Sequence, residues 1–258
     1  MQHWEVLIFF LGIAFVYASV GFGGGSSYLA ILTLYSFLFQ DFHEMKLIAL
    51  ICNIIVVTGG TIIFIRNKQV DWKKVLPLVL ISVPLAFLGA IIKLDKDTFF
   101  VVLGCSLVVA AVLLWIKTRR EGAELSTEYK GHFLKEAILG GAIGFLSGMV
   151  GIGGGIFLAP ILNLMKWDTP KKIAATASLF ILVNSISGIA GQLSAEPIDY
   201  INYVRVGFLC LAVLIGGMAG SLLGSVKFNQ VIIRRLTAVL VFAAGIEVLV
   251  KHLNSLMD

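Results

Sequence analysis

Eight long apolar stretches, almost free of charged side chains, limit what this chain can fold into. A hydrocarbon core about 30 Å thick is crossed by about 20 helical residues, and most of the stretches have about this length. Charged residues make up 14% of the chain, against about 25% in ordinary soluble domains. The sequence therefore excludes a soluble domain and predicts an all-α integral membrane protein. The stretches are residues 6–40, 47–65, 75–92, 98–116, 137–165, 173–195, 206–226 and 236–250.

Two of these stretches, 6–40 and 137–165, are too long for a single crossing. A continuous helix over residues 6–40 would reach about 50 Å at about 1.5 Å per residue. Both stretches contain a cluster of glycines, at positions 21, 23, 24 and 25 and at positions 151, 153, 154 and 155. We therefore expect each stretch to form a pair of short helices that are joined at the glycines. Such a pair returns to the side of the membrane from which it started.

The basic residues of the loops favour returning pairs over single crossings. Cytoplasmic loops of membrane proteins carry an excess of Lys and Arg. If both pairs return, fifteen of the 20 Lys and Arg residues fall on one face and five on the other. If each long stretch crossed once, the split would be eleven to nine, which carries no signal. The returning arrangement places the linker 117–135 in the cytoplasm and both termini outside it.

The glycine-broken stretches belong to an internal duplication. Residues 21–34 align with residues 151–164 at seven of fourteen positions, four of them glycine. Each repeat combines one returning pair with three transmembrane helices, an odd number of crossings, so the predicted repeats are inverted. Inverted repeats with broken helices are a recurrent plan of secondary transporters. Repeat 1 is 1–116, with the broken pair 6–40 and spans 47–65, 75–92 and 98–116; repeat 2 is 136–258, with the broken pair 137–165 and spans 173–195, 206–226 and 236–250.

The glycine clusters are the strongest candidates for a binding site. Glycines leave the backbone amides uncovered, and the helix that follows points its positive dipole end at the break. Bare amides at a helix N-terminus bind an anion without a formal charge. The alternative is that these glycines only let helices pack closely. The candidate residues are Gly23, Gly24, Gly25, Ser26 and Ser27 in the first repeat and Gly153, Gly154, Gly155 and Ile156 in the second.

Polar residues in the span after each break form a second group of candidates. They could complete the coordination of an anion, or they could hold neighbouring helices together by hydrogen bonds. These residues are Asn53, Thr176, Ser178 and Asn184. Lys46 and Lys171 open the two corresponding spans. They are either a pair of basic entrances that attract anions or ordinary flanking lysines that reach toward the interface.

Composition and motif spacing exclude several other functions. The formal net charge of +5 comes from residues in short loops, where it orients the protein in the membrane, so we expect no nucleic acid partner. Cys52, Cys105 and Cys210 lack metal-ligand spacing, and every His lies in a loop or near a chain end. We therefore expect no metal site, no cofactor and no enzymatic activity. Glu247 is the only acid inside a span, which is thin support for a proton relay.

The two glycine clusters, each followed by an apolar helix and then a span that opens with Lys, resemble the sulfite exporter TauE/SafE family. This family is also called the toluenesulfonate uptake permease family. The resemblance covers nearly the whole chain. The second copy, from Gly148 to Pro160, is close to the family pattern, whereas in the first copy Ala30 stands where the family pattern has a proline.

The inverted repeats and this resemblance together predict a secondary active transporter of the cell membrane that works by alternating access. Its substrate would be a small anion such as sulfite, a sulfonate or a related organosulfur anion, and its other partner would be the lipid bilayer. An anion channel on the same scaffold is the alternative. The identity of the anion, the direction of transport, the coupling ion and assembly into a homo-oligomer stay open.

Overall fold

The computed structural model describes most of the chain as helices. The described residues are 4–19, 22–35, 39, 42–92, 94, 96–119, 132–195, 202–224, 238–239, 241–242, 245–246 and 248–250. Gly21, Glu247, much of the linker 117–135 and part of the predicted span 236–250 lie outside them. Within the described residues there is no strand, and the helices are α1 (Trp4–Ser19), α2 (Gly25–Leu34), α3 (Phe42–Arg66), α4 (Trp72–Ile91), α5 (Lys96–Arg119), α6 (Phe133–Val150), α7 (Gly155–Leu164), α8 (Pro170–Ala195) and α9 (Tyr203–Gly224).

Five of the described helices are long and apolar enough to cross a membrane, namely α3, α4, α6, α8 and α9. α3 and α8 contain the predicted spans 47–65 and 173–195, and α4 and α9 contain the predicted spans 75–92 and 206–226 except for their last one or two residues. The fifth, α6, has 18 residues and forms the first part of the stretch 137–165, in which we expected two short helices. The predicted span 98–116 lies within α5. These helices make the protein a multi-pass membrane protein.

Both glycine clusters interrupt helices. α1 ends at Ser19 and α2 begins at Gly25, while α6 ends at Val150 and α7 begins at Gly155. The residues that precede α2 and α7 adopt the left-handed conformation, with φ of 89° at Gly24 and 78° at Gly154. Side chains with a Cβ are disfavoured in this conformation, so glycine at these positions allows the chain to turn into the next helix.

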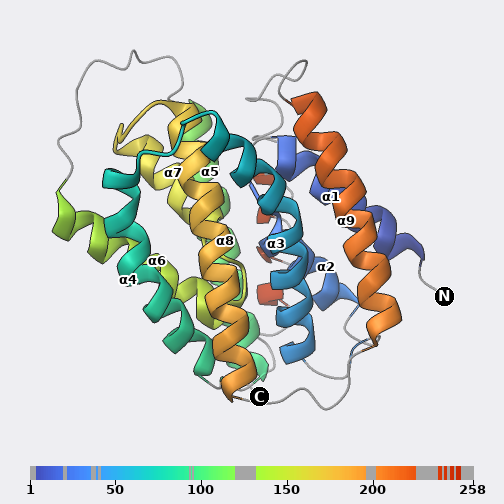
Figure 1. The fold of residues 1–258 in the computed structure, drawn as a ribbon. Helices are drawn as coiled ribbons and strands as arrows, with labels where there is room; N and C mark the ends of the chain where they lie inside the picture. Colours follow the sequence, from blue (N-terminus) through green and yellow to red (C-terminus); the bar gives the residue numbers. More distant parts are fainter. Residues whose placement is uncertain are drawn as a thin grey trace.

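Two long helix pairs form the sides of the molecule, and each pair joins distant parts of the sequence. α4 packs along α6, and α9 packs along α1 (Figure 1). A Cβ on Gly148 of α6 would overlap the carbonyl oxygen of Ala86, and a Cβ on Gly220 of α9 would overlap that of Phe15. Small residues thus let the helix backbones touch, as in other membrane proteins.

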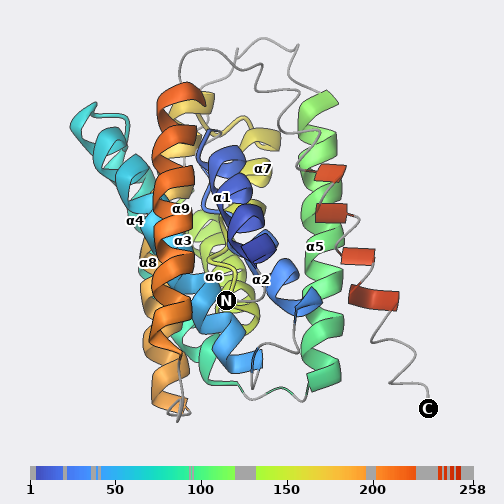
Figure 2. The ribbon, with the colours of Figure 1, turned by 90° about the vertical axis from the view of Figure 1, so that its right-hand side faces the viewer.

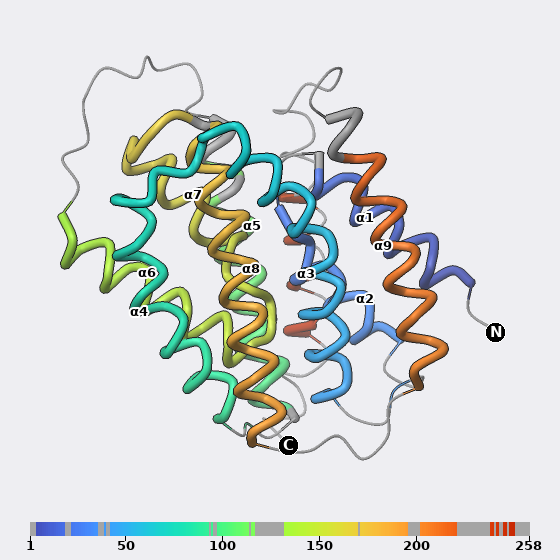
Figure 3. Tube along the Cα trace, in the orientation of Figure 1, coloured from blue at the N-terminus to red at the C-terminus, as the bar shows by residue number. Residues whose placement is uncertain are grey.

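The centre of the molecule is formed by α3 and α8, which pack against each other. These two helices run in opposite directions, and so do α4 and α9 (Figure 3). α2 packs on α3 and α7 packs on α8, so both glycine breaks lie against the central pair. α5 stands at one side of the bundle, where it contacts α7 (Figure 2).

Candidate functional site

The two glycine breaks meet inside the molecule. We call residues 22–26 the first elbow and residues 151–156 the second elbow. Every residue of both elbows is buried. A Cβ on Gly25 would lie 3.0 Å from the carbonyl oxygen of Ile152, so the backbones of the two elbows are in close contact. The structure therefore brings together two candidate sequences that lie about half a chain apart.

Asn53 of α3 connects the two elbows. Its Oδ1 accepts a hydrogen bond from the amide of Gly25 at 3.2 Å. Its Nδ2 donates to the carbonyl oxygen of Ile152 at 3.4 Å and to Oγ of Ser185 at 3.1 Å. Asn53 is 1% exposed, and Cβ atoms on Gly23 or Gly153 would collide with its side chain. One buried amide side chain thus holds α2, the second elbow and α8 in register.

The elbows carry backbone donors that the described residues leave unsatisfied. At the first elbow, Gly24 O accepts from the amides of Ser27 and Tyr28, both at 3.0 Å. None of the described residues accepts a hydrogen bond from the backbone amides of Ser26, Gly155 and Ile156. These amides belong to the first turns of α2 and α7, where the helix dipole is positive. The arrangement favours a negatively charged group.

Hydroxyl groups distinguish the first elbow from the second. The hydroxyls of Tyr17 and Ser27 form a hydrogen bond of 2.6 Å. The Tyr28 hydroxyl is buried, and none of the described residues is its hydrogen-bond partner. In the aligned second repeat, Phe157 and Leu158 stand at the positions of Ser27 and Tyr28. Sequence reasoning missed Tyr17 and Tyr28, although the aligned repeats already contained the difference between Tyr28 and Leu158.

The other polar candidates contact neighbouring helices. Ser178 of α8 shares a hydrogen bond of 3.0 Å with Thr61 of α3. Asn184 donates to Ser82 of α4 at 3.0 Å and to the carbonyl oxygen of Phe180 at 2.8 Å. The contacts with Thr61 and Ser82 are of the interhelical kind that was the alternative interpretation of both residues, whereas the contact of Asn184 with Phe180 lies within α8. The hydroxyl of Thr176 is buried and has no hydrogen-bond partner within the described ranges.

The two lysines that open the corresponding spans differ in their surroundings. Lys46 is 2% exposed, and its stem packs against Gly151 of the second elbow. Its Nζ lies 5.4 Å from the centroid of the Phe99 ring. Lys171 is exposed. Lys46 therefore places a buried cation near the second elbow, an environment that an ordinary flanking lysine does not have.

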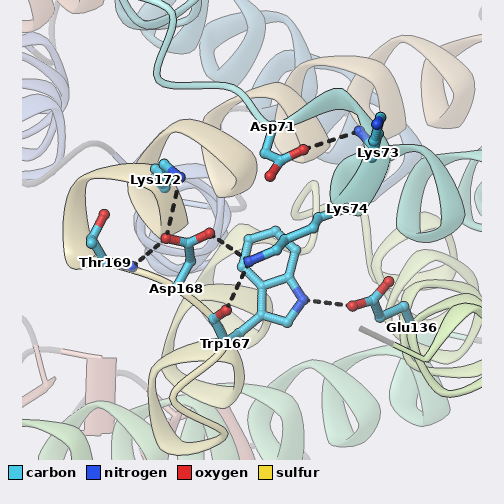
Figure 4. Close-up of polar contacts among 8 residues, drawn as sticks. All are labelled: Asp71, Lys73, Lys74, Glu136, Trp167, Asp168, Thr169 and Lys172. Atoms are coloured by element: carbon cyan, nitrogen blue, oxygen red, sulfur yellow. Dashed lines mark hydrogen bonds and ion pairs between the residues drawn. The ribbon is translucent and has the colours of Figure 1, made fainter. Parts of the chain in front are cut away.

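A polar cluster closes one end of the bundle, beside the start of α4 (Figure 4). Trp167 is 1% exposed, and its Nε1 donates to Glu136 at 2.8 Å. Nζ of Lys74 donates to Oδ2 of Asp168 at 2.7 Å and lies 5.3 Å from the Trp167 ring centroid. Lys172 pairs with the other oxygen of Asp168 at 3.6 Å. The cluster ties the loop after α7 to the first turns of α4 and α6.

The charge of Asp168 is stabilised by this cluster. Burial by itself raises the pKa of the Asp168 carboxyl group. Hydrogen bonds from Lys74 and from the amide of Thr169, together with the charges of Lys74 and Lys172, outweigh burial. The net result is a pKa below the ordinary value, so Asp168 stays ionised at neutral pH.

A related contact is present where α9 begins. The guanidinium carbon of Arg205 lies 5.2 Å from the centroid of the Phe39 ring. Arg205 and Lys74 occupy matching places near the starts of α9 and α4, and Phe39 and Trp167 each precede the next long helix. α4 begins near the top of the view and α9 near the bottom (Figure 1). A cation therefore packs on an aromatic ring at each end of the bundle.

A groove of about 530 Å³ between α3 and α9 has a different character. Its lining is almost wholly apolar and includes Ile55, Ile62 and Met218. The only hydroxyl of the lining, that of Thr58, donates to the carbonyl oxygen of Ile54 within its own helix. This groove suits lipid chains and offers no donors to an anion. Within the described part of the chain, no group of three or more His, Cys, Asp or Glu residues could hold a metal ion.

The fold and the two elbows indicate the class of protein. Broken helices whose irregular backbone is buried in the centre of a multi-pass helical bundle are typical of membrane transport proteins. The family model for the sulfite exporter TauE/SafE matches residues 6–248. The chain belongs to this family, and the protein is a membrane transporter.

Relatives cover most of the chain. The probable membrane transporter protein y4hK of Sinorhizobium fredii is 34% identical over 94% of this chain and 96% of its own length. The probable membrane transporter protein MJ0441 of Methanocaldococcus jannaschii is 30% identical over 81% of this chain and 80% of its own length. YunE of Bacillus subtilis, also a probable membrane transporter protein, is 26% identical over 86% and 88% of the two chains. No solved structure matches this chain significantly.

Proposed function

We propose that the protein is a secondary active transporter that moves a small anion across the cell membrane by alternating access. The anion is sulfite, a sulfonate or a related organosulfur anion. The observation that carries the proposal is the meeting of the two elbows around Asn53, where the amides of Ser26, Gly155 and Ile156 have no acceptor among the described residues. Membership of the TauE/SafE family supports this class of substrate.

An anion would supply the acceptors that the elbows lack. A buried amide without a partner costs about 1–3 kcal/mol, and a hydrogen bond to a charged group contributes about 1.5–3 kcal/mol. An oxyanion with several oxygens could accept from amides of both elbows, with the positive ends of the α2 and α7 dipoles adding attraction. Backbone donors hold the charge without the desolvation cost of a buried cation paired to it. Binding by backbone donors alone suits an anion that must be released again after transport.

Two inverted repeats are the architecture that we propose for this transporter. α3 and α8 occupy matching places in the aligned repeats and run in opposite directions, as do α4 and α9 (Figure 3). The helix packing matches between the repeats as well: α4 of the first repeat lies along α6 of the second, and α9 of the second repeat lies along α1 of the first. These matched pairs support an approximate two-fold axis in the plane of the membrane. In this orientation the linker 117–135 is cytoplasmic and both termini lie outside.

The two cation–π contacts are the proposed gates of the transport cycle. Lys74 packs on Trp167 at one end of the bundle, and Arg205 packs on Phe39 at the other. Release of one contact while the other holds would expose the elbows to one side of the membrane at a time. Both contacts are present in this structure and both elbows are buried, which corresponds to an occluded state of such a cycle.

Transport by purified protein in proteoliposomes tests the proposal. We expect saturable uptake of labelled sulfite or a labelled sulfonate, and accumulation against its gradient when an ion gradient is imposed. Gly154→Ala should abolish uptake, because the residue has a φ of 78° and its Cβ would lie 2.9 Å from the Phe180 ring. Gly12→Ala is the matched control, since nothing lies within 4 Å of its Cβ.

Each outcome of this experiment has a defined meaning. Loss of uptake in Gly154→Ala, with normal membrane insertion and normal uptake in Gly12→Ala, supports the site. Equal uptake in both variants contradicts it. Unitary currents without accumulation would establish the anion channel in place of the transporter, and absence of any anion flux in the wild type would refute both functions.

A further inference from the structure

Tyr28 has an environment that its role in packing does not explain. It is fully buried, and its ring stacks on Phe10 with 4.8 Å between the centroids. Across the described part of the chain, its hydroxyl finds no hydrogen-bond partner. A phenol hydroxyl in the interior of a protein is usually hydrogen-bonded, and one that is not costs free energy. Phe would fill the same space without this cost.

The hydroxyl of Tyr28 points toward the first elbow. Side chains of a helix lean toward its N-terminus, and Tyr28 lies in the first turns of α2, which begins at Gly25. The hydroxyl oxygen lies 3.1 Å from where a Cβ of Gly24 would be. Gly24 is the left-handed residue that precedes α2. The unpartnered hydroxyl thus lies beside the same turn as the unsatisfied amide of Ser26.

The second elbow has no phenol at the equivalent position. Leu158 stands at the position of Tyr28 in the aligned repeat, and the side chains nearest to Gly154 are those of Phe180, Ile143 and Ser147. The Ser147 hydroxyl already donates to the carbonyl oxygen of Gly144 at 2.9 Å. At the aligned position the second elbow therefore has a leucine in place of a donor, whereas the first elbow has a phenol hydroxyl with no partner among the described residues.

We propose that Tyr28 is a specificity-determining residue that donates a hydrogen bond to one oxygen of the transported oxyanion. This proposal rests on the proposed function, because it assigns a side chain to the same site. It also orients the substrate, because one oxygen of the sulfite or sulfonate group faces the first elbow, on the side of α2. An anion that lacks an acceptor oxygen, such as chloride, gains less from Tyr28 than an oxyanion does.

Thermal unfolding of the purified full-length protein tests this proposal. Wild type and Tyr28→Phe are titrated with sodium sulfite and with sodium methanesulfonate, with sodium chloride at matched ionic strength as reference. A ligand that binds the native state raises the unfolding temperature by mass action. We expect the affinity of Tyr28→Phe for both oxyanions to fall by at least about tenfold, since one hydrogen bond to a charged group is lost.

The unfolding temperature without ligand separates a binding role from a structural one. Removal of an unpartnered hydroxyl orphans no other group, so Tyr28→Phe should be as stable as the wild type or more stable. Tyr35→Phe is the matched control at the other end of α2, where the hydroxyl donates to Glu5 at 3.2 Å. We expect Tyr35→Phe to keep the wild-type affinity for both oxyanions.

Two results would overturn the assignment of Tyr28. One is an unchanged affinity of Tyr28→Phe for both oxyanions, while the wild type is clearly stabilised by them. The other is a fall in the unfolding temperature of ligand-free Tyr28→Phe that accounts for its weaker binding. If neither oxyanion stabilises the wild type more than chloride does, the proposed function fails together with this inference.

Discussion

Replacement of Asn53 by alanine is the sharpest test of how the two elbows are held together. The Asn53 side chain makes three hydrogen bonds, with the Gly25 amide, the Ile152 carbonyl oxygen and the Ser185 hydroxyl. All of these groups belong to buried residues. Asn53→Ala therefore leaves one backbone donor and one backbone acceptor without partners in the interior, together with one hydroxyl group.

The size of the effect follows from these contacts. Each net hydrogen bond contributes about 0.5–1.5 kcal/mol, and a buried group left unpaired costs about 1–3 kcal/mol. We expect the free energy of unfolding to fall by about 3 kcal/mol. At about 2–4 °C per kcal/mol for a domain of about this size, the unfolding temperature should fall by about 6–12 °C. Transport should be lost as well, because the elbows would no longer be held against each other.

Thermal unfolding in detergent, followed by the fluorescence of a thiol or tryptophan probe, measures this change. Asn163→Ala is the matched control, because Nδ2 of Asn163 donates to the carbonyl oxygen of Ala159 one turn earlier in α7. That variant should lose about 1 kcal/mol or less. An unfolding temperature of Asn53→Ala within about 2 °C of the wild type, or equal losses in the two variants, would refute the bridging role of Asn53.

Three further changes test other parts of the structure. Gly148→Ala should lower the free energy of unfolding by about 1–3 kcal/mol through overpacking against α4, whereas Gly207→Ala, with nothing within 4 Å of its Cβ, should be neutral or slightly stabilising in thermal unfolding. Trp167→Phe should cost about 1–3 kcal/mol by the same measurement, since buried Glu136 loses its indole donor. The lowered pKa of Asp168 contributes stability that is present above about pH 4 and is lost as the pH falls through the folded-state pKa. The unfolding temperature of Asp168→Asn should therefore depend less on pH below about pH 4 than that of the wild type.

Much of the fold was predictable because a bilayer constrains a sequence strongly. Charge-free stretches of about 20 residues become helices, since lipid offers no partners to an irregular backbone. α3, α4, α8 and α9 overlap the predicted spans almost completely for this reason. The lengths of α6 and α7 were less predictable. A glycine cluster shows where a helix stops, but it does not show how long the helices on its two sides are. The all-helical, membrane-spanning prediction is confirmed, and the inverted arrangement of the repeats stays a prediction.

The candidate site, like the fold, was predictable from the sequence only in part. The sequence by itself determined that two glycine clusters would break two helices, because the left-handed turns at Gly24 and Gly154 require glycine. Only the tertiary structure decided that the clusters touch, that Asn53 joins them, and that Asn184 turns toward Ser82 instead. The side of a helix that faces a given neighbour depends on how the two helices cross. The crossings depend on small residues such as Gly148, which lets its helix contact backbone atoms far away in the chain. A uniformly apolar helix carries little information about the direction of its few polar groups, so their partners emerge only once the bundle is assembled.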